Sequence, residues 1–238
     1  MPYQNSYIQL CKEHPRILLE KKDYIAHKWV WGKYFWNENP IALEIGTGMG
    51  NYFSYMVGKH ADINFIWLEL RYKRLYATAR KAWEVCKNTS ALTTSSACGK
   101  LWVKKTYSVQ ENYLVLKCYG QDILNVFSEN EISETYIYFP DPFYKKLKHK
   151  KHQLLSKKFL QDIYTCTKFW GELHFKTDHK EYFAETLEKI EKLWLWSIKF
   201  VTHDYKNSEI YNTSKITEFE WLFRGEQEDF YYVILEKK

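Results

Sequence analysis

Short β-rich runs alternate with amphipathic helical segments along most of this chain, and that alternation is the strongest constraint on its fold. Apolar runs of strand length occur at residues 41–46, 64–70, 113–119, 135–141 and 172–178. Helical periodicity begins near residues 51 and 72 and covers residues 157–168 and 181–194, and two later candidate strands cover residues 197–204 and 230–237. Because parallel neighbours need crossover helices, the pattern predicts an α/β fold with a mostly parallel, twisted sheet and helices on both faces. Ligands of such sheets bind beyond the carboxyl ends of the strands.

Length and composition favour one main domain. A chain of 238 residues, 45% hydrophobic and 27% charged, fills a single core and leaves little room for a second one or for extensive disorder. We expect a domain at residues 38–238 behind a basic and aromatic arm at residues 1–37, which packs on the core or, alternatively, stacks bases and binds phosphates. The small polar residues at 87–100 predict an exposed loop.

Nothing in the sequence indicates a membrane span or a secreted protein. No apolar stretch approaches the roughly 18 residues that a span requires, and the first ten residues lack a basic patch followed by an apolar run. A cytoplasmic protein is therefore expected. The five cysteines are scattered and contain no C-x-x-C pair, so neither a disulfide framework nor a zinc site is indicated.

Positive charge is concentrated in one segment. Seven lysines and no acid lie between Lys145 and Lys158, and removing them would change the formal net charge from +6 to about −1. Such a cluster is typical of a surface that binds a polyanion, although it is also compatible with a solvated loop in a lysine-rich protein.

Three alternating glycines follow the run at residues 41–45. Gly46, Gly48 and Gly50 separate this strand from the helix that begins near Asn51. Glycine suits a tight turn where a ligand approaches the backbone, and the G-x-G-x-G spacing differs from the G-x-G-x-x-G of dinucleotide folds. The loop therefore indicates a nucleoside without a pyrophosphate, unless the glycines only make the turn.

Two acids at later strand ends favour the nucleoside interpretation. Glu69 lies about 20 residues after the loop, where a carboxylate accepts hydrogen bonds from ribose hydroxyls. Asp122 follows the run at residues 113–119, where a carboxylate is placed to accept from the exocyclic amine of adenine. As an alternative, Asp122 is the N-cap of the next helix.

A third acid is restrained by two prolines. Asp141 lies between Pro140 and Pro142, after the strand at residues 135–139 and just before the lysine cluster. Each proline fixes its own φ angle and restricts the residue before it, so Asp141 is held at the strand end. An acid beside a polyanion-binding patch indicates a functional role; in the alternative, the prolines only terminate the strand.

From about Leu43 onward the chain closely resembles the bacterial tRNA (guanine-N7-)-methyltransferase family. The resemblance rests on five separated motifs, LEIGTGMG, WLEL, GQD, FPDPFYKK and GELHFKTD, followed by Thr217-Glu218-Phe219-Glu220. It implies a Rossmann-like class I methyltransferase fold, with S-adenosyl-L-methionine as methyl donor and no metal ion. It also implies methyl transfer to N7 of a guanine in the variable loop of tRNA, which gives 7-methylguanosine.

The resemblance also implies roles for individual residues. The implied cofactor contacts are Glu44, Gly46, Gly48, Gly50, Glu69, Asp122 and Asp141, and Asp141 is also the implied catalytic position. The implied substrate-binding positions are Lys145, Asp178, Thr217 and Glu220. Alternatively, Thr217 and Glu220 form the capping box of a surface helix, and Asp178 is a helix cap. The chain departs from the family pattern at Phe143, Tyr144, Leu147, Lys148 and Trp170, which affects the expected shape of the RNA cleft.

The implied chemistry fits these residue types. N7 of guanine carries a lone pair and no proton, so its attack on a sulfonium methyl needs no general base, and fixed geometry contributes roughly 7 to 11 kcal/mol. We expect Asp141 or Asp178 to stabilise the positive charge that develops on the purine, with one of them accepting from guanine N1–H and the N2 amine. The expected partner is tRNA, without a membrane or an obligatory protein partner, for a monomer or a homodimer.

Two other functions are compatible with parts of the sequence. One is a methyltransferase that acts on an amine in a protein or small molecule, which would have no use for the seven clustered lysines. The other is a non-catalytic RNA-binding protein, which would not need the glycine loop and the four acids Glu44, Glu69, Asp122 and Asp141.

Overall fold

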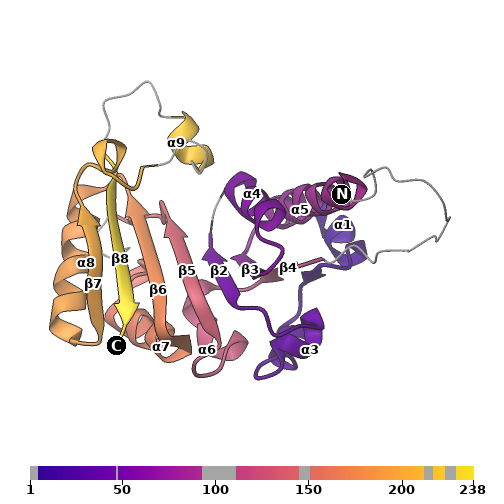
Figure 1. The fold of residues 1–238 in the computed structure, drawn as a ribbon, viewed down its shortest axis with the longest axis horizontal. Coiled ribbons are helices and arrows are strands. Elements are labelled where there is room, and N and C mark those ends of the chain that lie inside the picture. The colour runs from indigo at the N-terminus through magenta and orange to yellow at the C-terminus, as the bar shows by residue number, and fades with distance from the viewer. Residues whose placement is uncertain (1–4, 47, 93–110, 145–150, 212–216, 223–228) are drawn as a thin grey trace, which may run out of the picture.

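The computed structural model describes the chain except residues 1–4, 47, 93–110, 145–150, 212–216 and 223–228. Its centre is an eight-stranded sheet with the strand order β1-β4-β3-β2-β5-β6-β8-β7 (Figure 1). The strands are β1 (Ile17–Leu18), β2 (Ile41–Ile45), β3 (Asn64–Glu69), β4 (Tyr113–Lys117), β5 (Ile132–Tyr138), β6 (Thr167–Thr177), β7 (Trp196–Thr202) and β8 (Tyr231–Lys237).

All neighbouring strands from β1 to β6 are parallel, and β8 alone runs against its two neighbours, β6 and β7. In Figure 1 β8 therefore points down while the parallel strands beside it point up. This arrangement confirms the predicted mostly parallel α/β sheet. It also places the loops after β2, β3, β4, β5 and β6 along one edge.

Helices cover both faces of the sheet. The described helices are α1 (Tyr7–Glu13), α2 (Lys21–Ile25), α3 (Trp31–Phe35), α4 (Asn51–Lys59), α5 (Tyr72–Leu92), α6 (Ile123–Val126), α7 (Lys157–Cys166), α8 (Lys180–Leu193) and α9 (Glu218–Leu222). Helices α1, α4 and α5 pack together, as do α6, α7 and α8. None of these helices is both long and apolar enough to cross a bilayer.

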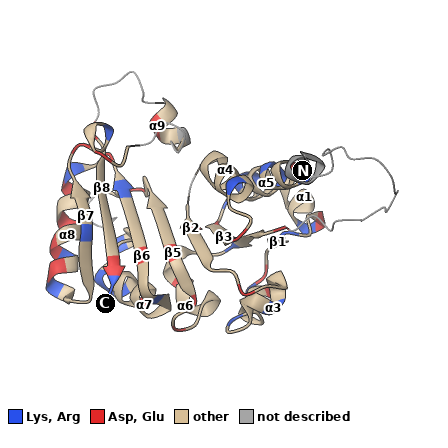
Figure 2. Ribbon diagram, viewed as in Figure 1, with Lys and Arg blue, Asp and Glu red and all other residues tan. Residues whose placement is uncertain are grey.

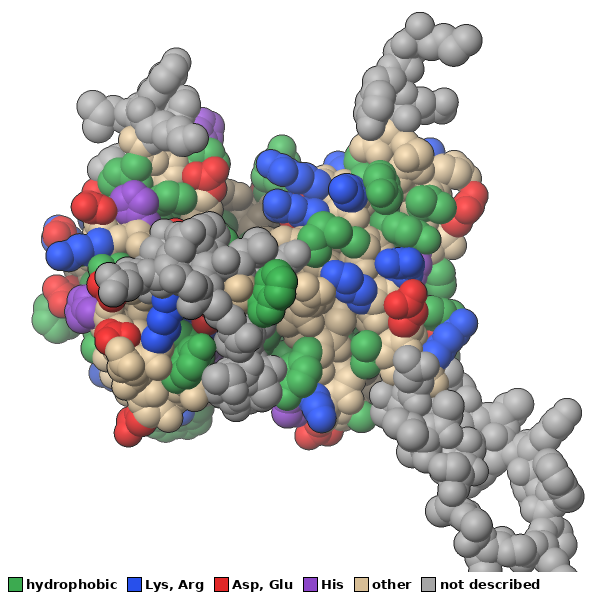
Figure 3. Space-filling model, turned by 90° about the horizontal axis from the view of Figure 1, so that it is seen from above, with side chains coloured by type: hydrophobic (Ala, Val, Ile, Leu, Met, Phe, Trp, Pro, Cys, Tyr) green, Lys and Arg blue, Asp and Glu red, His purple; other side chains and the backbone are tan. Residues whose placement is uncertain are grey.

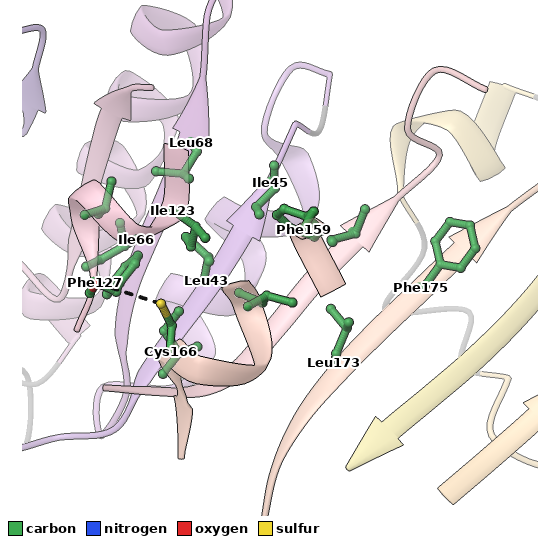
Figure 4. Packing of buried hydrophobic residues seen from close by; sticks show 14 of the residues in the cluster. Leu43, Ile45, Ile66, Leu68, Ile123, Phe127, Phe159, Cys166, Leu173 and Phe175 are labelled. Carbon is green, nitrogen blue, oxygen red and sulfur yellow. Dashed lines mark hydrogen bonds between the residues drawn. The ribbon is translucent and has the colours of Figure 1, made fainter. Parts of the chain in front are cut away.

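Two hydrophobic cores lie on opposite faces of the sheet because successive strand residues point to opposite sides. Leu43 of β2 and Leu173 of β6 belong to the core beneath α6, α7 and α8, which Figure 4 shows from close by. Ala42 and Trp67 belong to the other core, beneath α4 and α5. Central parallel strands are buried on both faces, which explains the continuous burial of β2 and β3.

The N-terminal arm is joined to the sheet. Its short strand β1 pairs with β4 at the sheet edge, and α1 packs on α5, where the His14 ring contacts Trp83 edge-on. In the same arm Trp31 is buried, whereas Trp29 and Trp36 are exposed. The proposed division between residues 37 and 38 stays a prediction.

The loop predicted at residues 87–100 is partly wrong. Helix α5 continues through Leu92, and residues 93–100 lie outside the described residues. Once a helix is nucleated, each added residue contributes a hydrogen bond, so the modest propensities of Asn88, Thr89 and Ser90 do not end it. Cys11, Cys86, Cys118 and Cys166 are buried, and these four described cysteines form no disulfide.

Candidate active site

The glycine loop connects β2 to α4 at the carboxyl edge of the sheet. Gly46 and Gly50 have φ angles of 72° and 73°, a region that favours glycine. A Cβ on Gly50 would lie 2.0 Å from Oγ1 of Thr78 on α5, so close packing of α4 against α5 requires this glycine. A Cβ on Gly46 would meet no protein atom within 4 Å, which leaves the backbone there open to a ligand.

A cleft of about 1100 Å³ opens at this edge. It is lined by Gly46 and by three of the sequence-predicted acids, Glu69, Asp122 and Asp141, each of which follows or ends a different strand. The volume suits a nucleoside-sized ligand with space beside it for a second group. Residues far apart in sequence therefore face one shared space.

Glu69 is fixed by its own backbone neighbours. Oε1 accepts hydrogen bonds from the N–H groups of Leu70 at 2.7 Å and Arg71 at 3.0 Å. Nη1 of Arg74 lies 3.7 Å from Oε2. The carboxylate is 7% exposed, and because these contacts occupy mainly Oε1, Oε2 is the oxygen with more capacity to accept from a ligand.

Asp122 ends a single 3-10 turn, Gly120–Asp122, after β4. Asp122 occupies the N-cap position of α6, as the alternative predicted, but its side chain makes no capping hydrogen bond to that helix. A Cβ on Gly120 would lie 2.8 Å from side-chain atoms of both Ile45 and Leu154, so this glycine allows the turn to pack against β2. The Asp122 side chain is exposed and lines the cleft.

Asp141 lies in a turn that continues the β5–β6 ladder. The N–H of Phe139 donates to the carbonyl of Lys176 at 2.8 Å, and the N–H of Phe143 donates to Oδ1 of Asp141 at 2.9 Å. Nε2 of Gln153 donates to the carbonyl of Pro142 at 2.9 Å. These contacts hold the turn from both ends, and the exposed Asp141 lines the cleft.

The two departures from the family pattern beside Asp141 have distinct places. Phe143 lines the cleft and has a φ angle of 51°. Tyr144 stacks on His179, with ring centroids 4.3 Å apart, and thereby packs the turn after β5 against the start of α8.

A second pocket, of about 380 Å³, adjoins the cleft and shares Gly46, Arg74 and Phe139 with it. Its walls are the glycine loop, the first residues of α4, Tyr138 of β5, and Thr217 and Phe219. Phe219 stacks on Phe139 with ring centroids 4.4 Å apart. The segment from Thr217 to α9 therefore forms one wall of this pocket.

Thr217 and Glu220 form the capping box that their spacing predicts. The N–H of Thr217 donates to Oε2 of Glu220 at 2.8 Å, and the N–H of Glu220 donates to Oγ1 of Thr217 at 3.2 Å. The other oxygen of Glu220 bonds Nζ of Lys176 at 3.0 Å, and both side chains of this ion pair are at most 3% exposed. Whether Thr217 and Glu220 also bind substrate stays a prediction.

Lys176 is enclosed by aromatic rings as well as by Glu220. Its Nζ lies 3.9 Å from the ring centroid of Tyr205, 4.6 Å from that of Tyr138 and 5.3 Å from that of Tyr232. Burial lowers the pKa of this ammonium group, and Glu220 opposes the shift. Cation–π contacts of this kind stabilise a desolvated ammonium by about 2 kcal/mol.

The remaining predicted site residues lie outside the two pockets or outside the described residues. Glu44 is 3% exposed and borders a small interior cavity with Tyr52 and Tyr136. Asp178 is exposed just after β6, and it is not the helix cap, because Nδ1 of His179 accepts from the N–H of Tyr182 at the start of α8. Lys145 lies outside the described residues.

The structure adds lining residues that the motifs did not single out. Arg71, Arg74 and Tyr119 border the cleft on one side, and Lys151 and His152 border it after the turn of Asp141. A sequence signal existed for four of them: two arginines lie within five residues of Glu69, and Lys151 and His152 belong to the lysine cluster. Among the described residues, no group of three or more His, Cys, Asp or Glu side chains is arranged to hold a metal ion.

Comparison with known proteins places this site in a family. A family described as "Putative methyltransferase" matches residues 38–233. A tRNA (guanine-N(7)-)-methyltransferase from Clostridium botulinum (strain Okra / Type B1) is 32% identical over 193 residues, which cover 81% of this chain and 80% of that protein. The corresponding Geobacillus sp. (strain WCH70) protein is 30% identical over 197 residues, which cover 83% of this chain and 78% of that protein.

A longer relative is similar to nearly the whole chain. A bifunctional glycosyltransferase/methyltransferase from Fusobacterium nucleatum subsp. nucleatum is 32% identical over 220 residues, which cover 92% of this chain. The chain spans 30% of the length of that relative.

Solved structures show the same fold at low sequence identity. The 16S rRNA methyltransferase KamB is similar with a TM-score of 0.55 and 11% identity, over 87% of this chain and 92% of that chain. A variant of the 16S rRNA (adenine(1408)-N(1))-methyltransferase from Catenulisporales acidiphilia, solved with its cosubstrate SAM, is similar with a TM-score of 0.55 and 13% identity, over 92% of each chain. With its parallel sheet, glycine loop and acid-lined cleft, the chain belongs to the tRNA (guanine-N(7)-)-methyltransferase family.

Proposed function

We propose that this protein transfers a methyl group from S-adenosylmethionine to N7 of a guanine in the variable loop of tRNA. The observation that carries the proposal is the shared cleft at the carboxyl edge, where Glu69, Asp122 and Asp141 meet the glycine loop. The names of the relatives and the basic residues on the cleft rim support tRNA as the acceptor.

The residues of the cleft fit a positively charged nucleoside donor. Oε2 of Glu69 is placed to accept from ribose hydroxyls, and the exposed Asp122 carboxylate is placed to accept from an adenine amine. Gly46 lets the donor approach the backbone between them, because a Cβ there would project into open space. Glu44 lies beneath α4, so any contribution from it passes through its buried neighbours.

When bound, S-adenosylmethionine supplies a methyl group on a positively charged sulfur. The guanine N7 lone pair forms the new N–C bond while the S–C bond breaks, and the positive charge moves from sulfur to the purine. No proton is removed at N7, so the site needs alignment and charge stabilisation instead of a general base. We assign the charge stabilisation to Asp141, whose turn is held from both ends, and we assign guanine contacts to Asp178 and to Thr217 with Glu220.

We assign the binding of RNA phosphates to the lysines from Lys145 to Lys158. Lys151 lines the cleft itself, and Lys157 and Lys158 are exposed at the start of α7. Phosphate contacts position an RNA without selecting its bases, so the choice of guanine falls to the acids.

The test is incubation of the purified protein with an unmodified tRNA transcript and donor labelled in its methyl group. We expect label in the tRNA and reductive chain cleavage at one guanine of the variable loop. A transcript with adenine at that position is the matched control and should accept no label. Label on free nucleosides, proteins or small amines but not on tRNA would contradict the proposal, and a protein that binds tRNA but no donor would be a non-catalytic RNA-binding protein.

A further inference from the structure

Helix α5 is basic over most of its length, a feature that the concentration of lysines elsewhere in the sequence obscures. Between Arg71 and Lys87 the chain contains six basic residues and one acid, Glu84. Three of the five arginines of the protein, Arg71, Arg74 and Arg80, lie in this segment. Figure 2 shows the resulting Lys and Arg positions along α5.

Three of these basic side chains form one exposed surface, the α5 basic face, which we define as Lys73, Arg80 and Lys87. Lys73, Arg80 and Lys87 are spaced by seven residues, so they lie nearly in line along the helix at intervals of about 10 Å. The other three basic residues point elsewhere: Arg71, which precedes the helix, lines the cleft, Lys81 donates to the carbonyl of Met49 at 2.8 Å, and Arg74 approaches Glu69.

The acid on this helix does not neutralise the face. Nε of Arg80 lies 3.9 Å from Oε1 of Glu84, and both side chains are more than half exposed. Exposed i, i+4 pairs at such distances contribute about 0.3–0.5 kcal/mol, so Arg80 can exchange this contact for a phosphate. Nζ of Lys87 lies 4.9 Å from the ring centroid of Trp83.

The α5 basic face begins next to the cleft, and the described residues of the lysine cluster reach the cleft from another element. Arg71, two residues before Lys73, lines the cleft together with Lys151 and His152, which follow the turn of Asp141 and form the other rim. Figure 3 looks onto this edge and shows Lys and Arg side chains gathered beside the central hollow. A polyanion that covers the cleft therefore meets positive charge on both sides, separated by the acids.

We propose that the α5 basic face binds the phosphate backbone of the RNA substrate on the far side of the cleft from the lysine cluster, so that the RNA bridges the cleft. The proposal rests on the proposed function for the identity of the RNA as tRNA. Two rims fix both the position and the direction of a strand across the reacting atoms, which a single lysine cluster does not do. The occupant is RNA backbone because an extended row of exposed cations matches a row of phosphates.

The experiment compares two triple variants with the same change in net charge. The test variant is Lys73→Gln, Arg80→Gln and Lys87→Gln, and it leaves the cleft-lining Arg71 in place. The control variant is Lys33→Gln, Lys168→Gln and Lys192→Gln. These exposed side chains lie in α3, at the start of β6 and in the last turn of α8, at the edge of the sheet opposite to the cleft. Gln is a good helix former, so both variants keep their helices.

For the test variant we expect the KM for tRNA to rise at least tenfold at 0.15 M salt, with kcat at saturating tRNA and the Kd for S-adenosylmethionine within twofold of the unmodified protein. The slope of log K for tRNA binding against log salt should become shallower by roughly 2 to 3, since each lost phosphate contact contributes about 0.7 to 0.9. The control variant should keep the slope. A test variant whose slope and KM match the control overturns the proposal.

A second measurement does not depend on variants. Lysine acetylation of the unmodified protein, with and without tRNA, should show protection of Lys73 and Lys87 and none of Lys192, and equal labelling of all three contradicts the proposal. If tRNA binding shows this protection and this change in salt slope but no tRNA is methylated, the proposed function is wrong and the proposed RNA-binding surface is supported. If tRNA is methylated without the protection and the change in slope, the proposed surface is wrong and the proposed function is supported.

Discussion

Asp141 combines an exposed carboxylate with a backbone that its neighbours hold in place. Its one hydrogen bond described here, from the N–H of Phe143, is one that an asparagine oxygen also accepts. Charge and geometry can therefore be separated at this position, because Asn keeps the shape of the turn and removes the negative charge.

We predict that Asp141→Asn lowers kcat for tRNA methylation by about 10²–10³-fold, the size of effect found when one transition-state contact is removed. The free energy of unfolding should stay within about 0.5 kcal/mol, because the substitution is exposed and keeps its hydrogen bond. Single-turnover methylation and urea unfolding measure the two quantities. The matched variant is Asp178→Asn, and near-normal turnover of both variants would exclude charge stabilisation by these acids.

Several tryptophans occupy a backbone region that suits glycine. Trp36 and Trp194 follow α3 and α8 with φ angles of 57° and 55°, and their side chains are 93% and 91% exposed. Trp170, one of the positions at which the chain departs from the family pattern, has a φ angle of 65°. A left-handed conformation costs an L-residue roughly 1–2 kcal/mol, and side chains this exposed recover little by burial.

Trp194→Gly should therefore raise the free energy of unfolding by about 1 kcal/mol, and Trp36→Gly should do the same. Trp194→Ala is the control, because it removes the same side chain and keeps the left-handed penalty. Chemical denaturation at one pH measures all three. Equal stability of the Gly and Ala variants would show that the side chain, and not the backbone, determines the effect.

At the scale of elements, α9 is tied to the sheet by one buried ion pair and one aromatic stack. Glu220 bonds both Lys176 of β6 and the backbone of Thr217, and Phe219 stacks on Phe139 after β5. The segment that walls the second pocket is thus positioned by β6. Removing one partner of a buried ion pair costs about 3–5 kcal/mol, because the other charge stays buried.

Lys176→Met should lower the free energy of unfolding by about 3–5 kcal/mol and raise the KM for tRNA more than it lowers kcat, because α9 loses its anchor. Adding Glu220→Gln should recover part of the stability, since Gln keeps the bond to the Thr217 N–H and buries no charge. A double-mutant cycle measures this coupling. Additive losses in the cycle would mean that the pair does not hold α9.

A second ion network links the three neighbouring strands β6, β8 and β7. Oε1 of Glu172 on β6 bonds Nζ of Lys199 on β7 at 2.5 Å, Oε2 lies 3.0 Å from Nε2 of His174, and Lys199 also reaches Glu236 on β8 at 3.3 Å. Hydrogen bonding from His174, with Lys199 beside it, lowers the pKa of Glu172 to about 2 from 4.5. A lowered carboxyl pKa stabilises the fold above the unfolded pKa and loses that contribution as pH falls towards the folded value.

Glu172→Gln should thus cost roughly 1–3 kcal/mol at pH 7, allowing for partial exposure, and the difference from the unmodified protein should shrink between about pH 4.5 and pH 2. Urea unfolding at a series of pH values measures it. Glu188→Gln on α8, whose pair with Lys192 is exposed, should change little at any pH. A difference that persists unchanged at pH 2.5 would show that the effect is not the charge of Glu172.

At the scale of the whole molecule, the parts predictable from sequence were those set by local pattern. The strands around the glycine loop follow from apolar runs, and Glu69, Asp122 and Asp141 meet because carboxyl ends of parallel strands share an edge. The surroundings of Lys176 were not predictable, because its partners come from β5, β8, α9 and the turn at Tyr205. Local pattern also could not decide between Asp178 and His179 as the cap of α8, since both types accept hydrogen bonds.

If both basic rims bind one RNA, the effects of changing each rim on the salt dependence of tRNA binding should add. The variant Lys151→Gln with Lys157→Gln removes two exposed charges from the lysine cluster, and the triple α5 variant removes three from the opposite rim. Each phosphate contact releases its own counterions and contributes separately to the salt slope. The reductions in slope should therefore add to roughly 3.5 to 4.5 when the two variants are combined. If only one rim bound the RNA, one of the two variants would leave the salt slope unchanged. Filter binding of one tRNA at five salt concentrations measures the slopes, with the Lys33, Lys168 and Lys192 control variant as reference. If the combined variant has a slope no shallower than that of the two separate variants, the RNA does not cross the cleft.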